Sequence, residues 1–140
     1  KNIEAFLRLD SPGTRWVIGG GPALDAFRAA WPGVNFLGPK YGEELATLLA
    51  SGDVFVFPSR TDTFGIVLLE AMACGMPVAA YPVPGPRDVV RHGETGILDE
   101  NLAGAVERAL GLDRNACRRQ ALEHTWERAT EEFFTHLVPA

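Results

Sequence analysis

The segment TDTFGIVLLEAMACG, residues 61–75, carries one acid in the middle of an otherwise apolar run. Glu70 follows Ile, Val and Leu residues and precedes Ala and Met, so a helix here would be apolar on every side. A carboxylate buried in such a helix is costly unless it meets a cation, several hydrogen-bond donors or a ligand. An internal ion pair with Arg60 or Arg87 and a ligand lying beside the helix both satisfy this requirement.

A polar loop, PSRTDTFG, comes directly before this helix. An apolar strand ends at Ser59, the loop carries Asp62 and Thr63, and Gly65 opens the helix, whose first free N–H groups attract anions. Because the chain has a net charge of −5, an anionic ligand must be held by such local groups. The alternative is that Asp62 or Thr63 simply caps the helix.

The glycine-rich turn GGGP, residues 19–22, is a weaker signal for phosphate binding. It precedes a segment of helical period, where backbone N–H groups could face an anion. However, it lacks the GK[ST] of a P-loop, and Leu24 stands where the dinucleotide pattern requires a third glycine. A plain tight turn and a ligand-facing loop both remain open.

Other catalytic patterns are absent from the sequence. His92, His124 and His136 lie far apart in polar settings, and neither HExxH, GxSxG nor the DxD of metal-dependent sugar transferases occurs. Cys74 and Cys117 have no metal-ligand spacing and read as small core residues. We therefore expect no metal site.

Composition indicates one globular domain. The chain has 140 residues, of which 46% are apolar and 22% charged, and no apolar run approaches the length of about 20 that crosses a bilayer. The negative net charge argues against a general nucleic-acid surface. The N-terminus lacks the plan of a secretory signal, so we expect a cytoplasmic protein.

Short apolar runs alternate with segments of helical period, which predicts an α/β fold with a parallel sheet covered on both faces. Strands are expected at residues 14–19, 34–38, 53–59, 77–82 and 96–98. Helices are expected at residues 2–9, 23–31, 42–50, 64–74, 87–91, 102–110 and 114–137, the last broken near His124. The run DVFVFP reads as a central strand, because it is apolar without alternation.

The start of the chain departs from this plan. Lys1 opens directly into a helix-like segment, whereas a doubly wound domain normally begins with a central strand. We therefore expect a strand upstream of Lys1. The ligand site of such a sheet lies outside the carboxyl ends of the strands, at the joints GGGP, GPKYG and YPVPGP.

Residues 58–90, PSRTDTFGIVLLEAMACGMPVAAYPVPGPRDVV, resemble the retaining glycosyltransferases of family four, also called glycosyl transferases group one, which have the GT-B architecture. The turn HGETGIL adds to the match, and weaker similarity runs through KNIEAFL, WVIGGGP, FLGPKYGEEL and DVFVFPS. The resemblance thus covers nearly the whole chain and implies the C-terminal donor-binding domain, a Rossmann-like doubly wound sheet of about five or six strands. TDTFG is similar to the branch of sulfolipid synthases and some mannosyltransferases.

The resemblance also implies roles for two acids separated by seven residues. Glu70 would hydrogen-bond the ribose hydroxyls of a nucleotide sugar, which explains the lone acid. Asp62, in place of the more usual Glu, would be the catalytic residue that contacts the hydroxyls of the donor hexose. The sugar and diphosphate would be held by backbone N–H groups around Thr63, Phe64, Gly65 and Ile66.

The remaining donor-binding residues lie in other segments. By the same resemblance, Lys1 pairs with the phosphates, Ser59 ends the strand at the site, and Gly21, Gly38 and Lys40 lie near the nucleobase. No cofactor or metal is implied beyond the nucleoside diphosphate sugar.

The implied activity is transfer of a hexose to an acceptor with retention of the anomeric configuration. The acceptor, a lipid, saccharide or small molecule, would bind an N-terminal domain that this chain lacks, so the chain alone would be inactive. The resemblance is compatible with peripheral membrane association of the full-length enzyme at the cytoplasmic face. A sugar-nucleotide 2-epimerase and a non-catalytic α/β binding module are the alternative interpretations.

Overall fold

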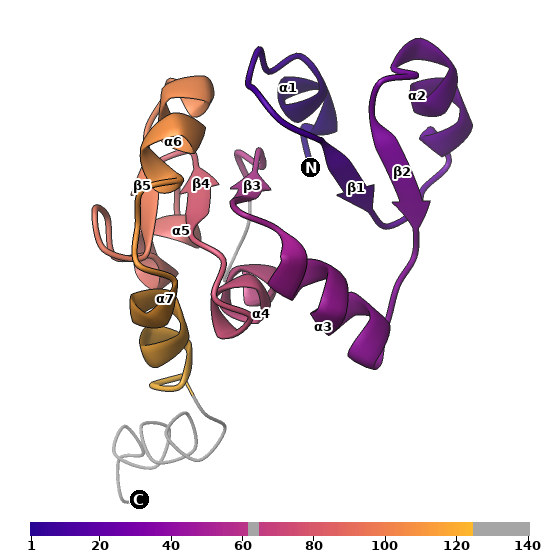
Figure 1. Ribbon diagram of the computed structural model, residues 1–140. Helices are drawn as coiled ribbons and strands as arrows, with labels where there is room; N and C mark the ends of the chain where they lie inside the picture. Colours follow the sequence, from indigo (N-terminus) through magenta and orange to yellow (C-terminus); the bar gives the residue numbers. More distant parts are fainter. Residues whose placement is uncertain (62–64, 125–140) are drawn as a thin grey trace, which may run out of the picture.

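The computed structural model describes residues 1–61 and 65–124, in which helices and strands alternate (Figure 1). The described strands are β1 (Trp16–Ile18), β2 (Asn35–Gly38), β3 (Phe55–Phe57), β4 (Val78–Ala80) and β5 (Gly96–Leu98). The described helices are α1 (Ile3–Leu7), α2 (Leu24–Ala30), α3 (Gly42–Ser51), α4 (Ile66–Ala73), α5 (Pro86–Val89), α6 (Leu102–Ala109) and α7 (Arg114–Ala121). The predicted α/β class and each predicted strand are confirmed.

The strands form two parallel sheets, not the single sheet that the sequence predicted. One sheet pairs β1 with β2, and the other has the order β3-β4-β5 (Figure 1). Helices connect successive strands, and α3 runs from the first sheet to the second. Among the described strands, β1 and β3 are therefore both edge strands.

The core surrounds β4. Val78 and Ala80 pack on one face of the strand in a cluster with Leu68 and Met72 of α4, while Ala79 packs on the opposite face with residues of α6. All three residues of β4 are fully buried. The central strand with two covered faces is thus β4.

The prediction that DVFVFP is the strand buried on both faces is wrong. Phe55 and Val56 of β3 are only half-buried, and Phe57 alone is buried. The apolar composition of the segment is that of a central strand, but β3 has a neighbour on one side only.

Two helices of the C-terminal half begin at side-chain caps. The Asn101 side chain accepts a hydrogen bond from the backbone N–H of Gly104 at the start of α6, and the Asp113 side chain accepts one from Asn115 at the start of α7. Helix α7 ends at Ala121, and the part of the predicted helix beyond residue 124 lies outside the described residues.

Candidate functional site

One large cavity gathers most of the described residues that the sequence predicted for a donor site. It encloses about 1130 Å3 and is bordered by β1, β3, the loop after β2 and one face of α4. Five of the predicted residues line it: Lys1, Gly21, Lys40, Ser59 and Glu70. Residues from five separate segments of the chain thus meet at one place.

The other predicted residues divide into two groups. Gly38, Gly65 and Ile66 belong to the described part of the chain but are not among the residues that line the cavity. Asp62, Thr63 and Phe64 lie outside the described residues, so the positions of the predicted catalytic acid and of the loop beside it stay predictions.

Glu70 is exposed, which corrects the expectation of a carboxylate buried in an apolar helix. Leu68, Ala71 and Met72 form the buried face of α4, at the i, i+3, i+4 spacing of an amphipathic helix. Glu70 lies on the other face and borders the cavity. It therefore has no burial penalty to offset in this chain.

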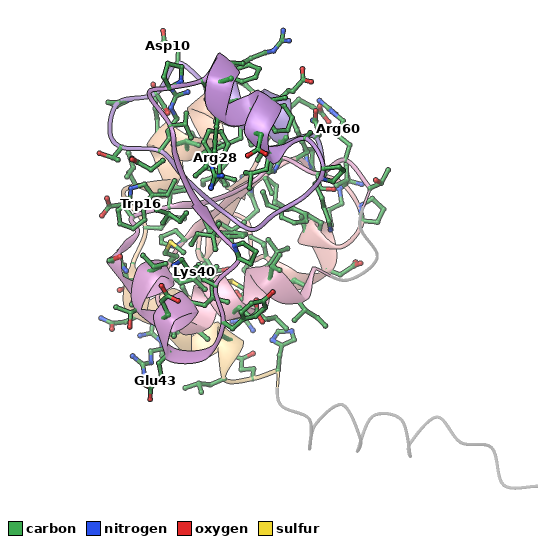
Figure 2. The ribbon with its side chains drawn as sticks, turned by 90° about the vertical axis from the view of Figure 1, so that its right-hand side faces the viewer. Asp10, Trp16, Arg28, Lys40, Glu43 and Arg60 are labelled. Atoms are coloured by element: carbon green, nitrogen blue, oxygen red, sulfur yellow. The ribbon has the colours of Figure 1, made fainter. Side chains whose placement is uncertain are left out.

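The internal ion pair considered for Glu70 is not formed among the described residues. The Arg60 guanidinium instead donates to the carboxylate of Glu100 at 2.9 Å and lies 3.8 Å from the ring centroid of Tyr81. The hydrogen bond that Arg60 donates to Glu100 raises the pKa of the guanidinium above its ordinary value. In Figure 2, Arg60 and Trp16, a residue that lines the cavity, lie on opposite sides of the molecule.

The N-terminus of α4 is built around a glycine that no other residue could replace without strain. Gly65 has φ 74°, and a Cβ atom there would lie 2.8 Å from Cδ1 of Leu68. The following residues, Ile66 and Val67, are 60% and 41% exposed, and their backbone N–H groups donate no hydrogen bond within the described residues. Since Val67 lines the cavity, the first turn of α4 lies at its wall.

Lys1 is held near the carboxyl end of β3 by its neighbour. Asn2 adopts a left-handed conformation with φ 55°, and its side-chain amide donates to the carbonyl oxygen of Pro58 at 3.0 Å. The Lys1 ammonium lies 5.8 Å from the ring centroid of Phe57. These contacts put a positive charge on the cavity wall, next to the strand that leads into the PSRTDTFG loop.

The loop after β2 supplies a second cation and an exposed aromatic ring. Lys40 forms an ion pair with Glu44 of α3, and its side chain is mostly buried. Tyr41, which lines the same cavity, is 78% exposed. Gly38 has a different role, because its carbonyl oxygen accepts a hydrogen bond from Gly19 and so joins the ends of β1 and β2.

Ser59 contributes to the shape of the cavity wall. It is buried, and its hydroxyl donates to the carbonyl oxygen of Thr61 at 2.9 Å, which fixes the turn after β3. Two further residues that line the cavity, Tyr41 and Val67, were not predicted from the sequence. Tyr41 directly follows Lys40 in GPKYG, and this position next to a predicted site residue was the signal that could have identified it.

The described residues contain no group of three or more His, Cys, Asp and Glu side chains that could hold a metal ion. The described helices also include none with the length and apolar character required to span a bilayer. The cavity is lined by three basic residues, Lys1, Arg15 and Lys40, and by two acids, Asp53 and Glu70, together with the start of α4 and glycine-rich turns. Such a set can hold an anion beside a hydroxyl-rich group.

Residues 2–112 match the family model described as "Glycosyl transferases group 1". The chain is 33% identical to a GDP-mannose-dependent alpha-mannosyltransferase of Mycobacterium tuberculosis, over 97% of this chain and 39% of the relative. It is 37% identical to the sulfoquinovosyl transferase SQD2 of Arabidopsis thaliana, over 81% of this chain and 25% of the relative. The chain thus spans well under half of each of these relatives.

Solved structures of similar fold include a sucrose-phosphate synthase from Thermosynechococcus elongatus, with a TM-score of 0.76 and 26% identity. The match covers 95% of this chain and 39% of that chain. HepE from Anabaena, solved in complex with UDP, matches with a TM-score of 0.72 and 22% identity, over 96% of this chain and 44% of that chain.

Proposed function

Because the chain belongs to the glycosyl transferases group 1 family, we propose that it is the donor-binding part of a glycosyltransferase that takes a hexose from a nucleoside diphosphate sugar. The observation that carries this proposal is the meeting of Lys1, Glu70 and the first turn of α4 at one cavity. A nucleoside diphosphate sugar presents phosphates that a cation and helix N–H groups can hold, and hydroxyls that a carboxylate can accept.

Each residue has a distinct role in this proposal. Glu70 accepts hydrogen bonds from the ribose hydroxyls, and the Lys1 ammonium with the N-terminus of α4 stabilises the negative charge of the departing nucleoside diphosphate. Asp62, in the loop outside the described residues, contacts the donor hexose. Reaction with retention and without a metal ion belongs to the same proposal.

The exposure of Glu70 supports its role as a ligand contact. The Glu70 carboxylate makes no ion pair or side-chain hydrogen bond within the described residues, and its position at the cavity leaves it accessible to a bound molecule. Tyr41, exposed in the loop after β2, adds a flat apolar surface at the same cavity. We assign it to the nucleobase, since aromatic rings stack on bases of any identity.

The acceptor belongs to a part of the enzyme that this chain does not supply. The mannosyltransferase of Mycobacterium tuberculosis, which this chain matches over 39% of its length, has room for a further domain. We place the acceptor cleft there, so that the reacting sugar lies between that domain and the cavity.

Titration of the chain with UDP, GDP, UDP-glucose and GDP-mannose, followed by amide resonances, tests the proposal. At least one of these ligands is expected to shift resonances of residues 19–21, 40–41 and 65–70. Glu70→Ala should weaken that binding by about 1 to 3 kcal/mol, the contribution of hydrogen bonds to a charged group. Glu107→Ala, an exposed acid on α6, is the matched control and should bind normally.

Two outcomes contradict different parts of the proposal. Unchanged affinity of Glu70→Ala would remove the assigned role of that residue. Absence of shifts with all four ligands would favour a non-catalytic α/β module. With an acceptor-containing longer enzyme, product analysis distinguishes sugar transfer from epimerisation at C2 of the hexose.

A further inference from the structure

Arg60 joins the carboxyl ends of three parallel strands. It is the third residue after β3, Tyr81 is the first residue after β4, and Glu100 is the second residue after β5. The Arg60 guanidinium lies 3.8 Å from the ring centroid of Tyr81 and donates to the carboxylate of Glu100 at 2.9 Å. Since these strands form one parallel sheet, the contacts connect side chains along the edge of the sheet at which a ligand site is expected.

Both partners of Arg60 are fixed to the sheet. Tyr81 directly follows the buried strand β4 and is itself buried. The residue before Glu100 extends the pairing of β4 with β5, because the N–H of Asp99 donates to the carbonyl oxygen of Ala80 at 3.0 Å. The guanidinium of Arg60 is therefore held against the sheet and not against another loop.

Arg60 belongs to a segment that forms part of the cavity wall, although its own side chain does not. Pro58 and Ser59 line the cavity, whereas Arg60 is not among the described residues that line it. Figure 2 shows Arg60 on the other side of the molecule from Trp16, a residue of the cavity wall. The Arg60 side chain thus contacts the sheet from outside the cavity while the adjoining residues face into it.

Three contacts fix residues 58–61 after the end of β3. The carbonyl oxygen of Pro58 accepts a hydrogen bond from the side chain of Asn2, and the Ser59 hydroxyl donates to the carbonyl oxygen of Thr61. Both contacts involve the backbone of the segment. The contacts of the Arg60 side chain are the third, and they connect the segment to the strands on the other side of β3.

The contacts of Arg60 restrict geometry more than they stabilise the fold. The side chains of Arg60 and Glu100 are 51% and 65% exposed, and ion pairs with such exposure contribute little to the free energy of unfolding. However, a planar guanidinium that lies over the ring of Tyr81 and also meets the carboxylate of Glu100 has few positions available. This requirement restricts where the backbone of residue 60 can lie.

We propose that Arg60 is a positioning residue for the donor site: its contacts with Tyr81 and Glu100 hold residues 58–61 in the place at the cavity wall that binding of a nucleotide sugar requires. The inference rests on the proposed function, which supplies the ligand. Arg60 acts through the segment and does not contact the ligand. Its positive charge is balanced by Glu100, so the phosphates are not assigned to it.

The experiment measures the affinity of the chain and its variants for UDP, GDP, UDP-glucose and GDP-mannose. Arg60→Ala removes both contacts, Arg60→Lys keeps the charge without the planar group, and Glu100→Ala removes one partner. The double variant Arg60→Ala/Glu100→Ala completes a double-mutant cycle. Because Glu100 lies outside residues 58–61 and is exposed, its variant tests the contact without a change in the segment itself. Arg119→Ala, at an exposed arginine that pairs with Asp113, is the matched control.

Arg60→Ala is expected to weaken binding of the nucleotide sugar by about threefold to thirtyfold, because a displaced cavity wall lowers affinity without loss of a direct ligand contact. Glu100→Ala should also weaken binding, although removal of an acid by itself favours an anionic ligand. The double variant should bind no more weakly than Arg60→Ala, and Arg60→Lys should restore only part of the loss. The urea midpoint of each variant should lie within about 0.5 M of that of the parent.

Three results would overturn this inference and leave the proposed function standing. One is equal affinity of Arg60→Ala and the parent. Another is tighter binding by Glu100→Ala together with weaker binding by Arg60→Ala, which would assign the charge of Arg60 to the ligand itself. The last is a double variant in which the two losses add, which would mean that the residues act separately. If the parent binds none of the four ligands, the proposed function and this inference both fail.

Discussion

The side-chain amide of Asn2 donates a hydrogen bond to the carbonyl oxygen of Pro58, 56 residues away in the sequence and 3.0 Å away in space. This bond fixes the first residues of the chain to the end of β3. It depends on a left-handed backbone at Asn2, a conformation that asparagine adopts more readily than most residues. The position of Lys1 at the cavity follows from it.

Two substitutions of Asn2 should distinguish the contribution of its hydrogen bond to stability from the cost of its left-handed backbone. Asn2→Gly retains the freedom for positive φ and loses the amide, so it should lower the free energy of unfolding by about 0.5 to 1.5 kcal/mol. Asn2→Ala adds the cost of a left-handed alanine, about 1 kcal/mol or more. Urea unfolding measures both, and equal stability of the Gly variant and the parent would show that the contact with Pro58 contributes nothing.

Glu70 should be neutral for stability although it lies on the helix with the most apolar sequence. Its side chain is exposed and has no partner among the described residues, so Glu70→Gln should change the free energy of unfolding by less than about 0.5 kcal/mol. Leu68→Ala on the buried face of α4 is the contrast, with an expected loss of about 2 to 5 kcal/mol. A loss above 1 kcal/mol for Glu70→Gln would show a hidden structural partner.

The sequence was informative where local pattern decides structure. The strand at residues 96–98 was predicted with the bounds that β5 has, and Gly42 was predicted as the first residue of α3. An apolar run flanked by turn residues restricts both the type of such an element and the positions where it begins and ends. The resemblance to the family placed Lys1, Lys40 and Glu70 at one site, and all three line one cavity. The rule that the site lies at the carboxyl ends of parallel strands pointed independently to the GPKYG joint that contains Lys40.

Two features could not be predicted because they depend on contacts between distant segments. Whether β3 has one neighbour or two is decided by pairing, and an apolar run such as FVF reads the same in either case. The exposed face of α4 could not be predicted for the same reason. Ile66 and Val67 are as apolar as Leu68, and only the packing of α4 and α7 around β4 decides which face of the helix is covered.

A buried polar network joins α7 to the β4-β5 connection. The Thr95 hydroxyl donates to the side-chain carbonyl of Gln120 and accepts from the N–H of Arg91, while the Gln120 amide donates to the carbonyl of Val89. Thr95 is fully buried. Each group in the network is therefore costly to leave without a partner.

Thr95→Val should destabilise the fold because it keeps the shape and removes the hydroxyl. The carbonyl oxygen of Gln120 and the N–H of Arg91 both lose a partner, at an expected cost of about 1 to 3 kcal/mol in urea unfolding. Thr95→Ser keeps the hydroxyl and loses one methyl, and it should be more stable than the Val variant. If Ser were the less stable of the two, methyl packing would outweigh the network.

Cys117 should make stability depend on pH in the alkaline range. Burial raises the pKa of its thiol above the ordinary value, so the unfolded chain releases this proton at lower pH than the folded chain does. The associated stability is complete below about pH 9 and is lost as the pH rises through the folded pKa, by up to about 1.4 kcal/mol per pH unit.

Because lysines and tyrosines also titrate there, the measurement is the difference in the free energy of unfolding between the parent and Cys117→Ala, in urea unfolding from pH 8 to 10.5. That difference should shrink with rising pH. Parallel curves for the parent and Cys117→Ala would mean that burial does not raise the pKa of this thiol.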